Sequence, residues 1–214
     1  MISVKNGKFT ACDGARFHQV RLDDFDLSMQ LAGPSITTLL KVLSFTDQEL
    51  IEVGETKDKL VFKLNNVLLF INKMNDPYPN VEQLWLRPAL NNDLELLVNK
   101  AELITAIKQV KVTVDANSIN IGLSIESDKM QVVAKGINKS ASTTIPCKWA
   151  GKPRNIVVNY IHLAEMLKSY SPNECRFLLD EESKTYKAPI LLKDDESSSL
   201  ATIAQRSAYL AGLT

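Results

Sequence analysis

The sequence predicts an α+β fold in which one unit, built of helices packed on antiparallel sheets, occurs twice. Short apolar runs separated by turn residues alternate with segments of helical spacing, a pattern typical of mixed folds. The segment ISVKNGKFTACDG at 2–14 also returns as LSIESDKMQVVAKG at 123–136. An offset of about 122 residues is too long for a solenoid repeat and indicates a duplicated domain.

The first copy opens with a hairpin. Apolar runs on both sides of Asn6-Gly7 predict a tight turn within 2–12, and residues 19–31 continue as strand. A helix is expected over 34–45, because Pro34 suits a first helical turn and apolar residues then recur at helical spacing, namely Ile36, Leu39, Leu40 and Leu43.

Strands follow this helix and also its counterpart in the second copy, a helix expected over 159–170. After the first helix the predicted strands are LIEVGE, KLVFKL and NVLLFINKM, with a turn at Asn65-Asn66 between the last two. After the second they are CRFLLDE, APILLKD and LATIAQ. The two copies therefore share one order of elements.

The second copy carries two elements that the first does not. A strand at 94–99 precedes a helix at 100–113, which Asn99 caps and in which Leu103, Ile107 and Val110 form the apolar stripe. Nothing before Met1 supplies their equivalents, so we expect a first domain short of about 30 residues, with an open sheet edge. Turn residues near 87–93 divide the chain into domains 1–90 and 91–214.

The amino-acid composition of the chain excludes several classes of protein. The 25 Lys and Arg residues balance 25 Asp and Glu residues, which excludes a binder that holds nucleic acid by a large positive excess but permits a local positive surface. No apolar stretch has the roughly 18 residues of a membrane span, so we expect a cytoplasmic protein. Cys12, Cys147 and Cys175 are widely spaced, which favours reduced thiols over a zinc site.

Catalytic motifs are absent from the sequence. It contains neither a phosphate-binding glycine loop nor a G-x-S-x-G nucleophile motif. His162 with Glu165 one turn later is interpreted as a surface pair, the alternative being a general base. Paired acids at 23–24, 181–182 and 194–196 fit solvated loops better than a metal site. We therefore expect no catalytic residue, cofactor or metal.

Lysines mark the polar sides of all three predicted helices. Lys100, Lys108 and Lys111 fall within about a quarter turn of one another, opposite the apolar stripe of their helix. Lys41 and Lys168 lie on the other two helices. A solvated helix face is the simple explanation, but together the lysines favour a DNA-facing surface that contacts phosphates without reading bases.

Three stretches resemble one family. ACDGARF at 11–17 is similar to an A-T-D-G-H-R-L segment, NDPYPNVEQL at 75–84 to a G-x-F-P-D-Y-x-x-V segment, and LLVNKAELITAIKQV at 96–110 to V-x-R-K-E-L-x-x-A-L-x-x-V. These segments occur, in this order and spacing, in the bacterial sliding clamp, the beta subunit of DNA polymerase III. The chain resembles that clamp from within its middle domain to the end of its third.

The resemblance implies a DNA clamp fold and a non-catalytic function. Clamps are rings of six similar domains whose helices line a central channel around duplex DNA, and they make the replicative polymerase processive. The expected partners are duplex DNA, the polymerase, the clamp loader and repair proteins, with a homo-oligomeric ring, a dimer, for a full-length chain. Neutral composition fits, because encirclement replaces affinity.

The resemblance also implies a hydrophobic pocket between the two domains that binds linear peptide motifs. Carried over by position, its residues are Cys12, Gly14, Ala15, Arg16, Phe17, Pro79, Gln83, Leu84, Thr202 and Ile203. Ala15 and Gln83 replace a family histidine and arginine, and the family's M-P-M-R-L ending is not visible. The C-terminal sequence ATIAQRSAYLAGLT is longer, and its tail is expected to cover or extend the pocket.

Other functions remain open at this stage. A regulatory or decoy module would keep the peptide pocket without encircling DNA, and it is favoured by the missing strand and helix. A clamp with two domains per chain in a trimeric ring is a variant that the same gap disfavours. A hydrolase using His162 and Glu165 is a more distant alternative.

Overall fold

The computed structural model describes residues 1–22, 27–45, 51–74, 78, 80, 83, 94–115, 118–179, 189–194 and 199–204. The chain forms two compact units, of which the first comprises Met1–Asp13 and Gln19–Pro79. The second comprises Gly14–His18 and Asn80–Thr214, so a short early segment groups with residues much later in the sequence. The expected boundary near 87–93 lies outside the described residues.

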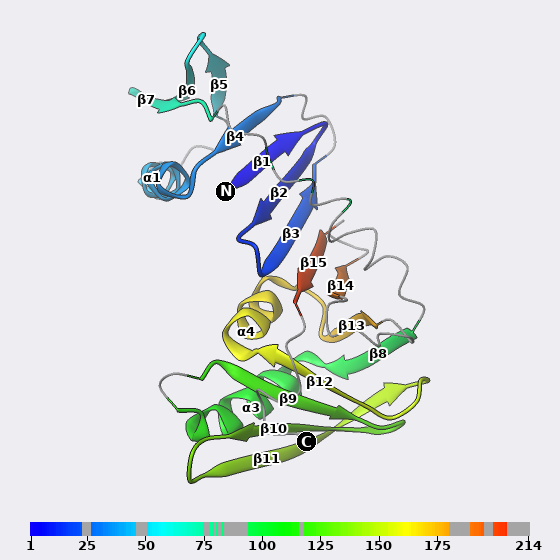
Figure 1. Ribbon diagram of the computed structural model, residues 1–214. Coiled ribbons are helices and arrows are strands. Elements are labelled where there is room, and N and C mark those ends of the chain that lie inside the picture. Colours follow the sequence, from blue (N-terminus) through cyan, green and yellow to red (C-terminus); the bar gives the residue numbers. More distant parts are fainter. Residues whose placement is uncertain are drawn as a thin grey trace. The chain divides into compact units, whose positions relative to one another are not determined.

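Strands of the first unit follow the order β4-β1-β2-β3, where β3 contributes its second half to this unit (Figure 1). Their bounds are β1 (Ile2–Lys5), β2 (Lys8–Cys12), β3 (Arg16–Arg21) and β4 (Met29–Leu31). Asn6 and Gly7 turn the β1–β2 hairpin with φ of 50° and 71°. Positive φ at both positions is what this tight turn requires, so the predicted hairpin is confirmed.

A helix and a three-stranded sheet complete the first unit. They are α1 (Gly33–Leu43), β5 (Glu52–Glu55), β6 (Lys59–Leu64) and β7 (Val67–Asn72). α1 packs on Leu60, Phe62 and Leu64, yet no residue of α1 is itself fully buried. The helix ends at Leu43, with Ser44 as its C-cap, two residues before the end of the predicted segment.

The second unit is a continuous sheet with two helices on it. Its strand order is β12-β9-β10-β11-β8-β13-β14-β15. The bounds are β8 (Leu94–Asn99), β9 (Asn120–Ile125), β10 (Lys129–Lys135), β11 (Ser140–Trp149), β12 (Arg154–Asn159), β13 (Glu174–Leu179), β14 (Ile190–Asp194) and β15 (Ser199–Ile203).

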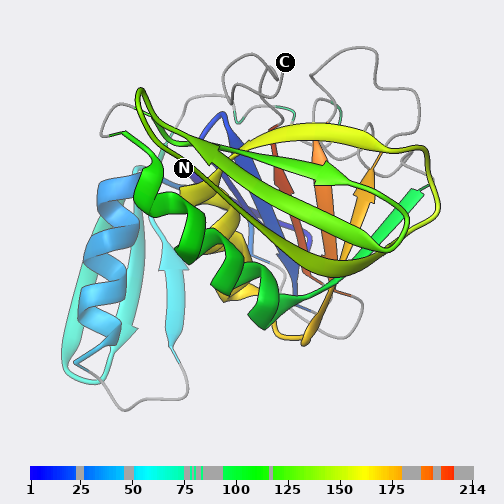
Figure 2. The ribbon, with the colours of Figure 1, turned by 90° about the horizontal axis from the view of Figure 1, so that it is seen from below.

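Its helices, α3 (Lys100–Val110) and α4 (Tyr160–Ser169), lie next to each other (Figure 2). An asparagine caps each: Asn99 accepts from the N–H groups of Ala101 and Glu102, and Asn159 caps α4 in the same way. The predicted stripe of α3, Leu103, Ile107 and Val110, is buried. The predicted helix over 100–113 finishes as a 3-10 turn over Lys111–Thr113.

The two units repeat one topology, which confirms the predicted duplication. The strand order β4-β1-β2-β3 corresponds to β12-β9-β10-β11. Val4 of β1 pairs with Phe9 of β2, and at the matching place Ile125 of β9 pairs with Met130 of β10. β8 pairs with both β11 and β13 and so makes one sheet of the second unit. The described residues of the first unit include no counterpart of β8 or α3, and β5-β6-β7 form a separate sheet there.

Two of the three cysteine thiols are buried in the second unit. Cys147 and Cys175 are buried, and burial raises the pKa of Cys175 to about 12, which keeps this thiol protonated.

No group of three or more metal-ligating side chains gathers among the described residues. Within the same residues, no helix is long and apolar enough to cross a membrane.

Replacing Asn159 with alanine should destabilise the second unit. Asn159 is 3% exposed, and its side-chain oxygen is the acceptor for the N–H groups of Ile161 and His162 at the start of α4. We expect a loss of about 1–2 kcal/mol in the free energy of unfolding by urea. Asn155→Ala on β12 is the matched control, because Asn155 is exposed. Equal losses in both variants would contradict the capping role.

Candidate functional site

Residues 14–18 lie along β15 within the second unit. The N–H of Ala204 donates to the carbonyl oxygen of Ala15 at 3.1 Å, and His18 Nε2 lies 2.7 Å from Ser199 Oγ. Ala15 is thus next to Ala204 and His18 next to Ser199, which makes the two segments antiparallel. Gly14 permits this path with a φ of 87°, a conformation that side chains disfavour.

Side chains alternate along this segment, as in any strand. Phe17 is only 2% exposed, whereas the side chain of Arg16, the residue before it, is 38% exposed. On β15, Thr202 is 1% exposed, and its buried Oγ1 makes no hydrogen bond within the described part of the chain. The segment and β15 therefore combine a buried phenylalanine, a partly exposed guanidinium and a buried hydroxyl that has no hydrogen bond among the described residues.

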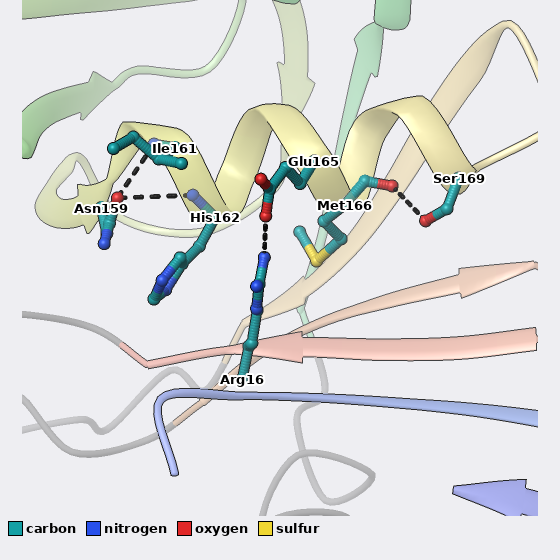
Figure 3. A network of polar contacts seen from close by, with 7 residues as sticks. All are labelled: Arg16, Asn159, Ile161, His162, Glu165, Met166 and Ser169. Carbon is teal, nitrogen blue, oxygen red and sulfur yellow. Dashed lines mark hydrogen bonds and ion pairs between the residues drawn. The ribbon is translucent and has the colours of Figure 1, made fainter. Parts of the chain in front are cut away.

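Helix α4 presents a carboxylate to that guanidinium. Arg16 forms an ion pair with Glu165, and His162 projects from the same side of the helix (Figure 3). The hydrogen bond from Arg16 lowers the pKa of Glu165, with nearby positive charge adding to the effect. Both side chains are partly exposed, at 38% and 50%, so the pair contributes little to stability. The ion pair matters because it engages the guanidinium group of Arg16.

The same pair bears on the hydrolase alternative. Arg16 engages the Glu165 carboxylate, and the positive charges of Arg16, His162 and Lys168 together lower the pKa of that group and hold it in its ionised form. The described residues thus place an arginine–glutamate ion pair next to His162 on the same side of α4. Sequence reasoning did not find the contact, since 149 positions separate its two residues and no local motif joins them.

Of the expected pocket residues, four contribute described side chains to the second unit near α4 and β15: Ala15, Arg16, Phe17 and Thr202. Gly14 precedes them at the bend. Cys12 belongs to the first unit and is partly exposed. Gln83 is exposed and exchanges hydrogen bonds with Asn80. Pro79, Leu84 and the side chain of Ile203 lie outside the described residues.

The lysines of the second unit fall into two kinds. Lys108, Lys111 and Lys168 are exposed. Lys100 instead donates its ammonium to the carbonyl oxygens of Tyr170 and Ser171, at 2.8 and 3.0 Å, and so ties α3 to the end of α4. Cations at a helix C-terminus are favourable, which gives Lys100 a structural role. Lys41, in the first unit, is exposed on α1.

The chain is similar in sequence and in structure to bacterial sliding clamps. The chain is 25% identical over 176 residues to the beta sliding clamp of Bacillus subtilis (strain 168), covering 78% of this chain and 46% of the clamp. The DnaN sliding clamp of Bartonella birtlesii, solved bound to griselimycin, superposes with a TM-score of 0.83 at 21% identity, covering 94% of this chain and 54% of that one. The chain has the bacterial beta sliding clamp fold.

Another clamp structure supports the same assignment. The Caulobacter crescentus beta sliding clamp gives a TM-score of 0.85 at 14% identity over 96% of this chain and 56% of the clamp. No family model matches the sequence. The chain spans about half the length of the clamps that it matches. The predicted resemblance and the predicted fold class are thus confirmed for the part of a clamp that this chain covers.

The contact between His18 and Ser199 should depend on pH. Burial lowers the pKa of His18 below its ordinary value of 6.5. A histidine whose folded-state pKa is lowered stabilises the fold above the unfolded pKa, and this contribution disappears as pH falls below it. We therefore expect the unfolding free energy to decline from pH 7 toward pH 5. In the His18→Gln variant this part of the decline should be absent, and an NMR pKa above 6.5 for His18 would contradict the assignment.

Proposed function

We propose that this chain is part of a DNA sliding clamp, a non-catalytic processivity factor that encloses duplex DNA and tethers a replicative polymerase. The supporting observation is the duplicated clamp topology, with TM-scores of 0.83 and 0.85 to two bacterial clamps. A charge balance of 25 to 25 suits such a protein, because a topological link needs only weak phosphate contacts.

In this proposal the exposed sides of α3 and α4 face DNA. Lys108 and Lys168 are exposed there, while Glu102 and Glu165 on the same helices keep the surface from becoming strongly positive. A weakly positive surface attracts the phosphate backbone without fixing the protein at one position. Lys100 is left out of this surface, because its ammonium is committed to backbone carbonyls.

Charge reversal of the exposed lysines tests this surface. Lys108→Glu with Lys168→Glu should weaken binding to duplex DNA and reduce the slope of log K against log salt by about 0.9 for each phosphate that the protein no longer neutralises. Fluorescence anisotropy over a range of salt concentrations measures both quantities. Lys152→Glu is the matched control, because Lys152 is exposed in the β11–β12 turn. Equal slopes for the double variant and the control would reject the DNA-facing assignment.

We also infer that the Gly14–His18 segment, β15 and α4 contribute to a site for an extended partner peptide. An accessible guanidinium beside apolar and unpaired polar groups suits a peptide that carries apolar anchors and an acidic or carbonyl-rich flank. Within the second unit, Arg16 is the residue best placed to meet such a flank, since it already binds the carboxylate of Glu165. The partners would be polymerase, clamp-loader and repair proteins, as in sliding clamps.

Arg16→Ala is the sharper test of this peptide site. Phe17→Asp would bury an unpaired carboxylate at a position that is 2% exposed, so it would unfold the segment whatever the function. Arg16→Ala should instead lower the affinity for a fluorescent clamp-binding peptide about tenfold, which corresponds to roughly 1.4 kcal/mol of binding free energy. Arg21→Ala, an exposed arginine on β3, is the control. Unchanged affinity in the Arg16 variant would remove Arg16 from the site.

The decoy module remains the second candidate. It would keep the peptide site of the second unit without enclosing DNA. Retention on closed circular DNA distinguishes the two functions: a clamp stays on a circle and slides off the same DNA once it is linearised. Peptide binding without retention on the circle would establish the decoy and reject the clamp.

A further inference from the structure

Glu165 is an acidic group in a positively charged setting. Its carboxylate forms an ion pair with Arg16, and the charges of His162 and Lys168 act on it as well. The hydrogen bond from Arg16 and the surrounding positive charge lower the pKa of Glu165 below its ordinary value of 4.5. The carboxylate is therefore ionised at neutral pH, and it fills a place that attracts negative charge.

The ion pair joins two separate elements of the second unit. Arg16 opens β3 just after the bend at Gly14, and its guanidinium points to Glu165 in the middle of α4 (Figure 3). Both side chains are partly exposed, so solvent reaches the pair without any change in the packing of the unit. An incoming carboxylate can therefore replace Glu165 on the guanidinium while Glu165 turns into water.

The strength of the pair suits such an exchange. An arginine fork binds carboxylates through charge-assisted hydrogen bonds, so the carboxylate of a ligand and that of Glu165 compete for the same donors. A partly exposed ion pair changes an equilibrium by only about two- to fivefold. Glu165 thus weakens the binding of a second carboxylate without preventing it.

We propose that Glu165 is a specificity-determining residue of the peptide site: its carboxylate occupies Arg16 in the free protein and is displaced by an acidic side chain of the partner peptide. This inference rests on the proposed peptide site and adds the chemistry of the flank that meets Arg16. A peptide with a neutral flank leaves the ion pair in place. Glu165 therefore weakens acidic partners selectively, which narrows the difference in affinity between acidic and neutral ones.

Glu165→Gln tests the proposal, because it keeps the size of the side chain and removes its charge at a partly exposed position. Fluorescence anisotropy measures the affinity for two clamp-binding peptides that differ only in one flank residue, glutamate or glutamine. We expect the variant to bind the glutamate peptide about two- to fivefold more tightly and the glutamine peptide as the wild type does. Glu102→Gln is the matched control, since it removes one negative charge from an exposed position on the neighbouring helix α3.

A double-mutant cycle separates competition for Arg16 from a general change in charge. Arg16→Ala removes the group for which the two carboxylates compete. In that background, Glu165→Gln should change the affinity for the glutamate peptide no more than Glu102→Gln does. An undiminished gain without Arg16 would overturn the proposal, because the gain would then come from long-range attraction alone.

The pKa of Glu165 provides a measurement that begins without peptide. In an NMR titration the wild type should show a pKa below 4.5, and Arg16→Ala should return it toward that value. Saturation with the glutamate peptide should also raise the pKa, because the carboxylate of the peptide takes the guanidinium. The glutamine peptide should leave it unchanged. A pKa that responds equally to both peptides would overturn the displacement of Glu165.

The outcomes distinguish this inference from the proposed function. If neither peptide binds the wild type, the peptide site and the role of Glu165 fail together. If both bind and Glu165→Gln changes their affinities equally, the site stands and the role of Glu165 is overturned. A gain that depends on Arg16 for duplex DNA but is absent for the glutamate peptide would assign the guanidinium to a DNA phosphate and would also overturn the proposal.

Discussion

Strand β8 is the element on which the architecture of the second unit depends. All six of its residues pair with β13 on one side, and three of them, Leu96–Val98, pair with β11 on the other, so that β8 unites two groups of strands into one sheet. The chain then enters α3 directly at Asn99, which is both the last residue of the strand and the cap of the helix. One short segment therefore closes the sheet and starts a helix that covers it.

The contrast between the two units follows from this constraint. In the second unit a single large core includes residues from β8, α3 and α4, such as Leu96, Leu103 and Leu167, all at most 2% exposed. In the first unit the described core is the small cluster around Phe62, and α1 has no fully buried residue. Among the described residues of the first unit, no second helix lies beside α1 and no strand joins the two groups of strands, so less apolar surface is buried there.

The functional site depends on contacts that no local pattern encodes. Arg16 meets Glu165 across 149 positions because residues 14–18 lie beside β15 and α4 packs in the same unit. The Asp-Gly bend before Arg16 is visible in the sequence. The sequence does not show that the residues after this bend lie beside β15. In the same way, Lys100 shares a helix with Lys108, yet its ammonium is bound by carbonyls beyond the end of α4.

The sequence by itself determined the repeated plan, because hairpin turns, helix caps and apolar periodicity are local. Asn6-Gly7 predicted a hairpin, Asn99 a helix start, and 94–99 a strand with the bounds that the structure shows. It did not single out β11, whose Ser- and Thr-rich first half has little apolar signal and becomes a strand by pairing with β10. Only the tertiary structure decided that Arg16 would be engaged and that Lys100 would be structural. Those outcomes depend on which segments become neighbours after folding, and spacing along the chain does not contain that information.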